Sequence, residues 1–230
     1  MNRVERPSPN RDSRGKTAID ALVLHYTGME SAEAALSRLC DPQARVSAHY
    51  VIAEDGGLYR LVAERKRAWH AGVSFWDGAR DINACSIGVE LVNPGHELGY
   101  RPFPEPQIES LITLARDLLA RHPIRPWRIL GHSDVAPSRK TDPGELFPWE
   151  RLAREGIGLW PEEAEDPGER VAAELLTHLG YDPDAVPEKR VAAFQRHFRP
   201  ARVDGVADGQ TRRLLKGLVT LFDAAQRRRM

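Results

Sequence analysis

Residues 131–144 read Gly-His-Ser-Asp-Val-Ala-Pro-Ser-Arg-Lys-Thr-Asp-Pro-Gly, which gathers a histidine, a lysine and an aspartate in one short run. Two prolines and a closing glycine interrupt regular structure, so the run is predicted to be a loop. Loops held by a rigid scaffold commonly carry chemistry. His132 and Asp142 can face one point if the loop folds back, and Lys140 can point the same way as Asp142. This combination indicates a metal site with a nearby charge stabiliser.

The composition is that of an ordinary globular protein with room for a medium domain and a small one, since 41% of its 230 residues are hydrophobic. Lys+Arg and Asp+Glu are both 33, and the resulting zero net charge argues against nucleic-acid binding driven by phosphate attraction. Cys40 and Cys85 make no disulfide framework. No apolar run reaches the ~20 residues of a membrane span, and residues 1–16 lack an apolar signal-peptide core. A cytoplasmic location is therefore expected.

Short apolar segments alternate with amphipathic ones over the first two thirds of the chain. The run Leu22–Leu24 is typical of a strand buried on both faces, and it ends in His25. Asp55-Gly56-Gly57 predicts a hairpin between two further strands. Strands are predicted at 18–28, 47–53, 58–62, 87–93 and 128–131, and helices at 31–39, 105–120 and 149–155. The expected fold is α/β, with a central mixed sheet flanked by helices.

Changes in composition divide the chain into four segments. Residues 1–17 have no periodicity and are predicted to be a flexible N-terminal arm or a surface strap. Residues 18–160 hold the predicted sheet. Residues 161–168 are acidic and bracketed by prolines, as expected of a linker. Residues 169–230 predict three amphipathic helices, a domain small enough that docking on the first domain would help its core.

Glu90 is the best general-base candidate in the chain. It alternates with Ile87, Val89 and Leu91 in a predicted strand, so it shares the other face with Gly88. A carboxylate in so apolar a strand is costly without a partner, and partial desolvation tunes such a group for proton transfer. An ion pair with an arginine is the alternative interpretation.

His25, His132 and Asp142 supply two imidazoles and a carboxylate. Three protein ligands with an open fourth position are the pattern of catalytic zinc, so one zinc ion per chain is predicted. Zinc lowers the pKa of its bound water to about 7. Glu90 would take the water's proton, and Lys140 would offset charge on the carbonyl oxygen. A histidine such as His25 is, on its own, more often a hydrogen-bonded core residue.

Candidate substrate contacts come from the hairpin and from the segment after it. An indole beside an imidazole can form the wall of a sugar- or peptide-binding groove, with a satellite core cluster as the alternative. For the hairpin histidine, a partly buried structural role is slightly favoured. The candidates for substrate binding are His49, Trp69, His70, Ala71 and Asn83.

Five runs together resemble the zinc-dependent N-acetylmuramoyl-L-alanine amidases of type 2, whose fold is shared with phage amidases and peptidoglycan recognition proteins. The runs are Leu24–Thr27, Ser47–Tyr50, Trp69–Gly72, Ser86–Leu91 and Gly131–Gly144. The resemblance implies zinc ligands at His25, His132 and Asp142, and catalytic roles for Glu90 and Lys140. Phage relatives carry a tyrosine where this chain has Ala48, so Glu90 would carry the proton transfer.

Residues 193–198 and 203–211 are similar to a peptidoglycan-binding three-helix domain, although a plain stabilising bundle also fits them. The expected reaction is hydrolysis of the amide between N-acetylmuramic acid, in its 1,6-anhydro form, and L-alanine of the stem peptide. The chain would act as a monomer on muropeptides during cell-wall recycling. An exported periplasmic or wall-degrading amidase, a recognition protein that binds muropeptides without cutting them, and a different zinc peptidase remain alternatives.

Overall fold

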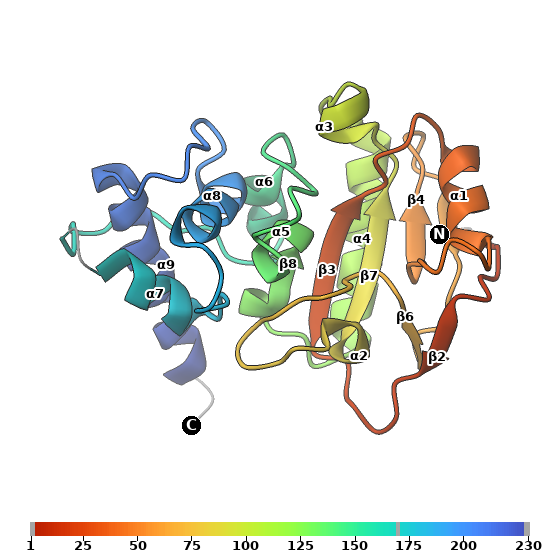
Figure 1. Cartoon of the computed structure of the whole chain (residues 1–230), viewed down its shortest axis with the longest axis horizontal. Coiled ribbons are helices and arrows are strands. Elements are labelled where there is room, and N and C mark those ends of the chain that lie inside the picture. Colours follow the sequence, from red (N-terminus) through yellow and green to blue (C-terminus); the bar gives the residue numbers. More distant parts are fainter. Residues whose placement is uncertain (1–2, 169–170, 228–230) are drawn as a thin grey trace.

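A six-stranded sheet lies at the centre of the computed structural model, which describes residues 3–168 and 171–227 (Figure 1). The strands are β1 (Arg3–Glu5), β2 (Arg11–Ser13), β3 (Ala21–Tyr26), β4 (Tyr50–Ile52), β5 (Leu58–Arg60), β6 (Lys66–Ala68), β7 (Ser86–Leu91) and β8 (Ile129–Gly131). Their order in the main sheet is β1-β5-β4-β7-β3-β8, and β2 pairs with β6 in a second, two-stranded sheet. Neighbours in the main sheet are parallel except β4 and β5, which form the predicted hairpin. The mixed sheet is as predicted.

The predicted helices are present with nearly the expected limits. Ser31 caps the first one, because its hydroxyl accepts a hydrogen bond from the Ala34 N–H over 3.2 Å. Helices α2 and α3 were not predicted. The helices are α1 (Ala32–Cys40), α2 (Ile82–Cys85), α3 (Gly95–Leu98), α4 (Glu105–Arg121), α5 (His132–Val135), α6 (Trp149–Arg154), α7 (Ala172–Leu179), α8 (Pro187–Phe198) and α9 (Gly209–Arg227).

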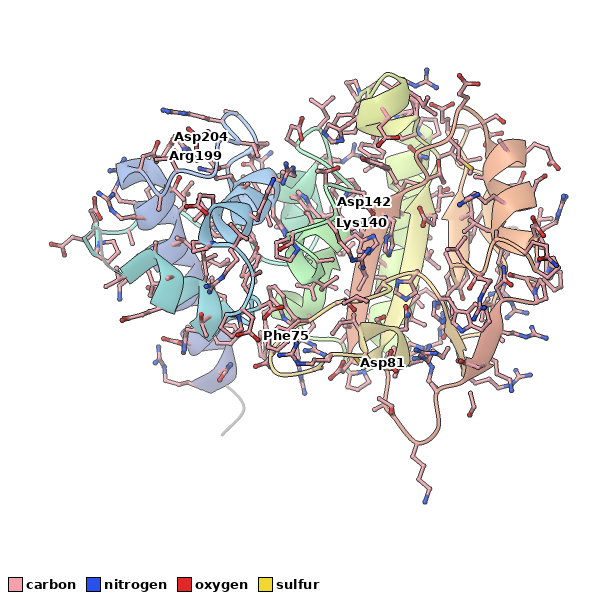
Figure 2. The ribbon with its side chains drawn as sticks, viewed as in Figure 1. Phe75, Asp81, Lys140, Asp142, Arg199 and Asp204 are labelled. Carbon is pink, nitrogen blue, oxygen red and sulfur yellow. The ribbon has the colours of Figure 1, made fainter. Side chains whose placement is uncertain are left out.

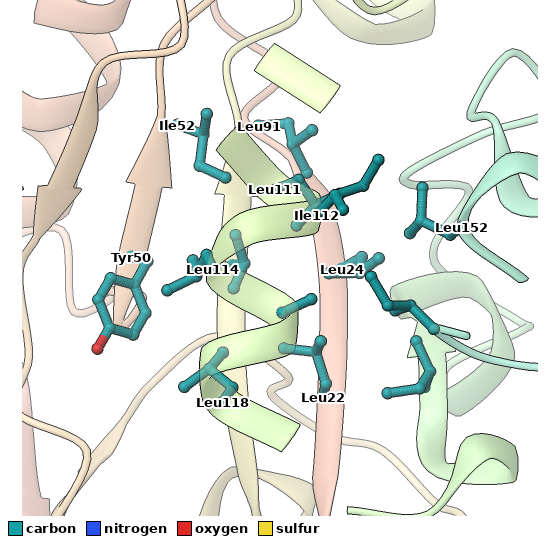
Figure 3. Close-up of a cluster of buried hydrophobic side chains, with 14 of the residues drawn as sticks. Leu22, Leu24, Tyr50, Ile52, Leu91, Leu111, Ile112, Leu114, Leu118 and Leu152 are labelled. Atoms are coloured by element: carbon teal, nitrogen blue, oxygen red, sulfur yellow. The ribbon is translucent and has the colours of Figure 1, made fainter. Parts of the chain in front are cut away.

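Helix α4 covers one face of the sheet and forms the largest apolar core with it (Figure 3). Leu22 and Leu24 of β3 point toward α4, and both are fully buried. Burying each such side chain contributes about 2 kcal/mol to folding. Because side chains alternate along a strand, Val23 and His25 point to the opposite face. That opposite face carries the functional site.

The carboxyl ends of three parallel strands meet at one edge of the sheet. His25 of β3 lies opposite Glu90 of β7, and Leu24 lies opposite Gly131, the last residue of β8. His132 follows directly as the first residue of α5. Ligands of open α/β sheets bind at such an edge.

Residues 3–14 are not a free arm, which corrects the prediction made for 1–17; residues 1–2 lie outside the described part. β1 pairs with β5, and β2 pairs with β6. The buried guanidinium of Arg14 donates to the carbonyls of Lys66 and Ser86 over 2.8 and 3.0 Å. The structure is closer to the alternative prediction of a surface strap. The segment pairs through its backbone groups, so its sequence shows no apolar pattern that would reveal the strands.

The run 131–144 also contains regular structure, contrary to prediction. His132–Val135 form α5, and the Asp134 carboxylate accepts the Gly131 N–H over 2.7 Å and closes the turn. Pro137 prevents continuation of this helix but does not prevent its formation. Gly131 ends β8, and residues 136–144 are irregular, as expected.

Helices α7, α8 and α9 form a C-terminal helical unit that packs beside α5 and α6 (Figure 1). An apolar cluster joins Leu130 and Val135 of the sheet domain to Phe194 and Leu215 of the unit. The segment 161–168 has no regular structure, and Glu163 forms an ion pair with Arg213 of α9. Residues 169–170 and 228–230 of the predicted domain lie outside the described residues. None of the described helices has both the length and the apolar character needed to cross a membrane.

Candidate active site

Three ligand atoms converge where β3, α5 and the loop after α5 meet. The Nδ1 atoms of His25 and His132 are 2.9 Å apart, and each lies 3.0 Å from Oδ2 of Asp142. All three side chains are buried. Figure 2 shows Asp142 and Lys140 on the loop beside β3. The structure thus brings together the three predicted metal ligands from distant parts of the chain.

Hydrogen bonds behind the site fix the tautomer of both histidines. The Nε2–H of His132 donates to the Ala71 carbonyl over 3.1 Å, because a carbonyl can only accept. The hydroxyl of Ser86 donates to the Ile82 carbonyl, so it accepts from the Nε2–H of His70 over 3.2 Å. His70 Nδ1 therefore carries a lone pair that accepts the Nε2–H of His25 over 3.0 Å. Both ligand Nδ1 atoms consequently present lone pairs.

The electrostatics keep the cluster in the state that binds a cation. Burial lowers the pKa of His25 to about 4, and the neighbouring His132 acts in the same direction. Burial alone would raise the pKa of Asp142, but the two histidines outweigh it and hold that pKa well below its usual range. With the tautomers fixed by these hydrogen bonds, a carboxylate oxygen and two nitrogen lone pairs face one another, and a cation between them would relieve their repulsion.

The donor set suits a divalent metal ion with nitrogen and oxygen ligands. Zinc binds histidine nitrogen and carboxylate oxygen at about 2.0–2.2 Å in tetrahedral geometry, which places ligand atoms about 3.3 Å apart. The observed separations of 2.9 to 3.0 Å are close to that value. Metal-ligating histidines usually donate their other N–H to a fixed acceptor, as both do here. The residues therefore fit a metal site with three protein ligands.

Glu90 faces this cluster from β7 and lines the same cleft. Its Oε2 atom is buried and has no hydrogen-bond partner within residues 3–168 and 171–227. Burial, followed by repulsion from Asp142, raises the pKa of Glu90 well above its usual value, while Lys140 opposes the shift. The alternative of an arginine ion pair is not seen in the described structure. An unpartnered carboxylate with a raised pKa can accept a proton from water at the site.

The cleft beside the cluster has a volume of about 530 Å³, within the usual range for ligand sites. Trp69 and His70 line it, and so does Lys140. The other three candidates for substrate contact do not line it: His49, Ala71 and Asn83.

Those three residues are buried behind the cleft wall, which corrects their prediction as substrate contacts. His49 Nδ1 accepts the Gly88 N–H over 3.0 Å. The side-chain oxygen of Asn83 accepts the backbone N–H groups of His70 and Ala71 over 3.0 and 2.8 Å. They therefore hold the Trp69–Ala71 backbone in place, and only the structural interpretation of His49 is supported.

The family model described as N-acetylmuramoyl-L-alanine amidase matches residues 15–145. The N-acetylmuramoyl-L-alanine amidase AmiD of Escherichia coli K12 is 39% identical over 233 residues, which cover 89% of this chain and 83% of that protein. This chain belongs to the N-acetylmuramoyl-L-alanine amidase family. It is a hydrolase that cuts the amide bond between N-acetylmuramic acid and L-alanine.

Two solved structures agree with this fold over about nine tenths of the chain. AmiD from E. coli, in complex with the substrate anhydro-N-acetylmuramic acid-L-Ala-D-gamma-Glu-L-Lys, has a TM-score of 0.80 at 38% identity, covering 92% of this chain and 93% of that one. AMPDH3 from Pseudomonas aeruginosa, in complex with anhydromuramic pentapeptide, has a TM-score of 0.81 at 33% identity, covering 89% and 92%.

Two residues that support this amidase site were not predicted from the sequence. Arg139 donates to the Ala71 and Val73 carbonyls, the former being the carbonyl that holds His132. Gly88 leaves the space that His70 occupies, since a Cβ there would lie 2.3 Å from the His70 ring. The alternating pattern of β7 places Gly88 on the same face as Glu90, and this was the one feature of the sequence that could have indicated a role for Gly88 at the site.

Gly88→Ala is expected to weaken zinc binding by about tenfold or more, because a displaced His70 releases the ring of His25. Chelator competition measures the affinity, and circular dichroism checks that the variant is folded. Gly57→Ala is the control, since the nearest atoms to its Cβ lie at 3.1 Å or more and belong to side chains. Native zinc affinity in a folded Gly88→Ala protein would contradict the orienting role of His70.

Proposed function

We propose that the chain is a zinc-dependent amidase in which His25, His132 and Asp142 hold one zinc ion. The supporting observation is the convergence of three lone-pair atoms within 3.0 Å of one another, beside an open cleft. Zinc bound there supplies a Lewis acid for the scissile carbonyl and lowers the pKa of a water to about 7. No other cluster of this kind is found among the described residues.

The two remaining catalytic roles fall to Glu90 and Lys140. Oε2 of Glu90 accepts the proton of the attacking water and then donates it to the amine of the departing L-alanine. The Lys140 ammonium group, for which the described residues show no hydrogen bond or ion pair, offsets negative charge as it develops on the carbonyl oxygen. The lysine lies close enough to Glu90 to counteract the upward shift of its pKa.

The proposed substrate is a muropeptide with a 1,6-anhydro-N-acetylmuramic acid. Two structural relatives hold ligands of that class, anhydro-N-acetylmuramic acid with a tripeptide and anhydromuramic pentapeptide. The cleft offers Trp69 as an apolar wall against which a sugar ring or a peptide can pack. Cell-wall recycling in the cytoplasm, by a monomer, is the setting that we propose. Recovery of the mature protein outside the inner membrane would instead favour an exported, wall-degrading amidase.

We also propose that the C-terminal helical unit is related to peptidoglycan-binding domains. Its motif residues make internal contacts: the fully buried Gln195 accepts the N–H groups of Asp204 and Gly205 over 3.0 and 2.8 Å. Arg199 and Asp204 also lie well apart from Asp142 in Figure 2. The motif therefore supports a likeness in fold, and any contact with the wall would use other, exposed side chains of the unit.

The direct test is to incubate the protein with anhydro-N-acetylmuramoyl-L-Ala-γ-D-Glu-L-Lys, with and without a zinc chelator. We expect anhydro-N-acetylmuramic acid and free tripeptide, identified by mass, and restoration of activity when zinc replaces the chelator. Binding without cleavage would indicate a recognition protein. Cleavage within the peptide would indicate another zinc peptidase, and undiminished activity after complete removal of metal would refute the zinc proposal.

Glu90→Gln is expected to retain zinc but to lower kcat by about 10²- to 10⁴-fold, because the amide cannot accept the proton. Steady-state kinetics and metal analysis of the same preparation measure the two effects. Glu174→Gln, an exposed carboxylate of α7, is the matched control. A kcat within twofold of the native value would remove Glu90 from the mechanism.

A further inference from the structure

Asp134 is a buried carboxylate on α5, two residues after the metal ligand His132, and the proposed mechanism does not use it. It is 1% exposed and receives three hydrogen bonds. One comes from the Gly131 N–H over 2.7 Å. The other two come from the C-terminal helical unit: the Tyr181 hydroxyl and the Nδ1–H of His197, both over 2.7 Å. Two of its three donors thus belong to the C-terminal helical unit.

Both donors are held rigidly by aromatic contacts. The Tyr181 ring packs edge-on against Trp76, with ring centroids 4.8 Å apart. The His197 ring is stacked on Trp149 at 3.7 Å and on Phe198 at 3.8 Å. Burial and then the charge of Asp134 raise the pKa of Tyr181 well above its usual value, so its hydroxyl remains a donor. These contacts aim two fixed donors at one carboxylate.

Helix α5 depends on such contacts because it is a single turn of four residues. A turn this short has no intrinsic stability in water, so its position is set by what packs against it. A buried carboxylate that loses its hydrogen-bond donors is strongly destabilised, and the turn that carries it must shift to find new ones. His132 is the first residue of that turn.

The second support of His132 also depends on the C-terminal unit. The carbonyl that accepts the Nε2–H of His132 belongs to Ala71, at the start of the loop 71–77. In this loop, the Phe75 N–H donates to the Val135 carbonyl over 2.8 Å, and the Asp77 N–H donates to the Gly180 carbonyl over 2.8 Å. The loop therefore bridges α5 and the helical unit.

We propose that Tyr181 and His197 are positioning residues that hold the metal ligand His132 in place through Asp134, which makes the C-terminal helical unit part of the active-site framework. The inference rests on the proposed metal site and adds a role for residues that contact neither metal nor substrate. An apolar cluster also joins the two units. The hydrogen bonds of Tyr181 and His197 are additional to this cluster, and their acceptor, Asp134, lies on the turn that carries the metal ligand His132.

The test uses the full chain and compares variants that differ in one hydrogen bond. Tyr181→Phe removes one donor. His197→Leu and His197→Asn both lose the stacked ring, but the asparagine retains an N–H group near the position of Nδ1. Tyr59→Phe, a hydroxyl removal away from the cleft, and Asp184→Ala, which breaks the exposed contact with Arg80 between the units, are the controls.

Three quantities are measured at 25 °C: zinc affinity by chelator competition, kcat and KM on the anhydro-muropeptide at saturating zinc, and hydrogen exchange of residues 131–136 in the metal-free protein. For Tyr181→Phe and His197→Leu we expect zinc binding weaker by about tenfold, the lower end of the effect of removing a ligand's hydrogen-bond partner. We also expect a lower kcat with little change in KM and faster exchange in residues 131–136. His197→Asn should lie nearer the native protein than His197→Leu, and both controls should match the native protein.

The inference is overturned if Tyr181→Phe and His197→Leu retain native zinc affinity and native exchange within twofold, even when their melting temperatures fall, because their role is then structural only. If the native chain itself binds no zinc, the proposed metal site fails, and the exchange measurement on metal-free protein still decides whether these residues hold α5.

Discussion

Repulsion among three lone pairs is the constraint on which the site depends. Two imidazole nitrogens and a carboxylate oxygen, from His25, His132 and Asp142, lie within 3.0 Å of one another in a buried place. The backbone carbonyl of Ala71 and the ring of His70 fix the N–H on the far side of each imidazole. The proposed divalent cation would replace this repulsion with coordination, which couples metal binding to the stability of the folded site.

The parallel pairing of β3 with β7 and β8 brings these groups to one edge of the sheet. β3 and β7 place His25 opposite Glu90, while β8 ends where α5 begins. The proposed ligands His25 and His132 and the proposed proton acceptor Glu90 therefore meet at one edge of the sheet. One face of β3 packs against α4 and anchors the strand, which leaves the other face free for chemistry. The amide-cleaving activity of the family is therefore built on the rigid part of the domain, with the loop after α5 supplying Lys140 and Asp142.

Sequence alone predicts the parts of this arrangement that depend on local pattern. β3 and β7 are apolar runs buried on both faces, and the roles proposed for His25 and Glu90 follow from their places in those runs. Polar strands such as β1 leave no such pattern, because their pairing is made by backbone groups. The contacts of Asp134 with Tyr181 and His197 join residues 47 and 63 positions apart, so no motif can contain them. The buried role of His49 was favoured by its place in a strand, whereas Ala71 and Asn83 were misplaced because they support the cleft from behind.

The proposed site holds one divalent ion among the three ligand atoms. The most direct measurement is a crystal structure of zinc-loaded protein with anomalous differences collected on both sides of the zinc absorption edge. We expect a single strong peak about 2.0–2.2 Å from the Nδ1 atoms of His25 and His132 and from an Asp142 carboxylate oxygen. An empty map at these three atoms in protein that has bound stoichiometric zinc, or a peak held by other residues, would contradict it.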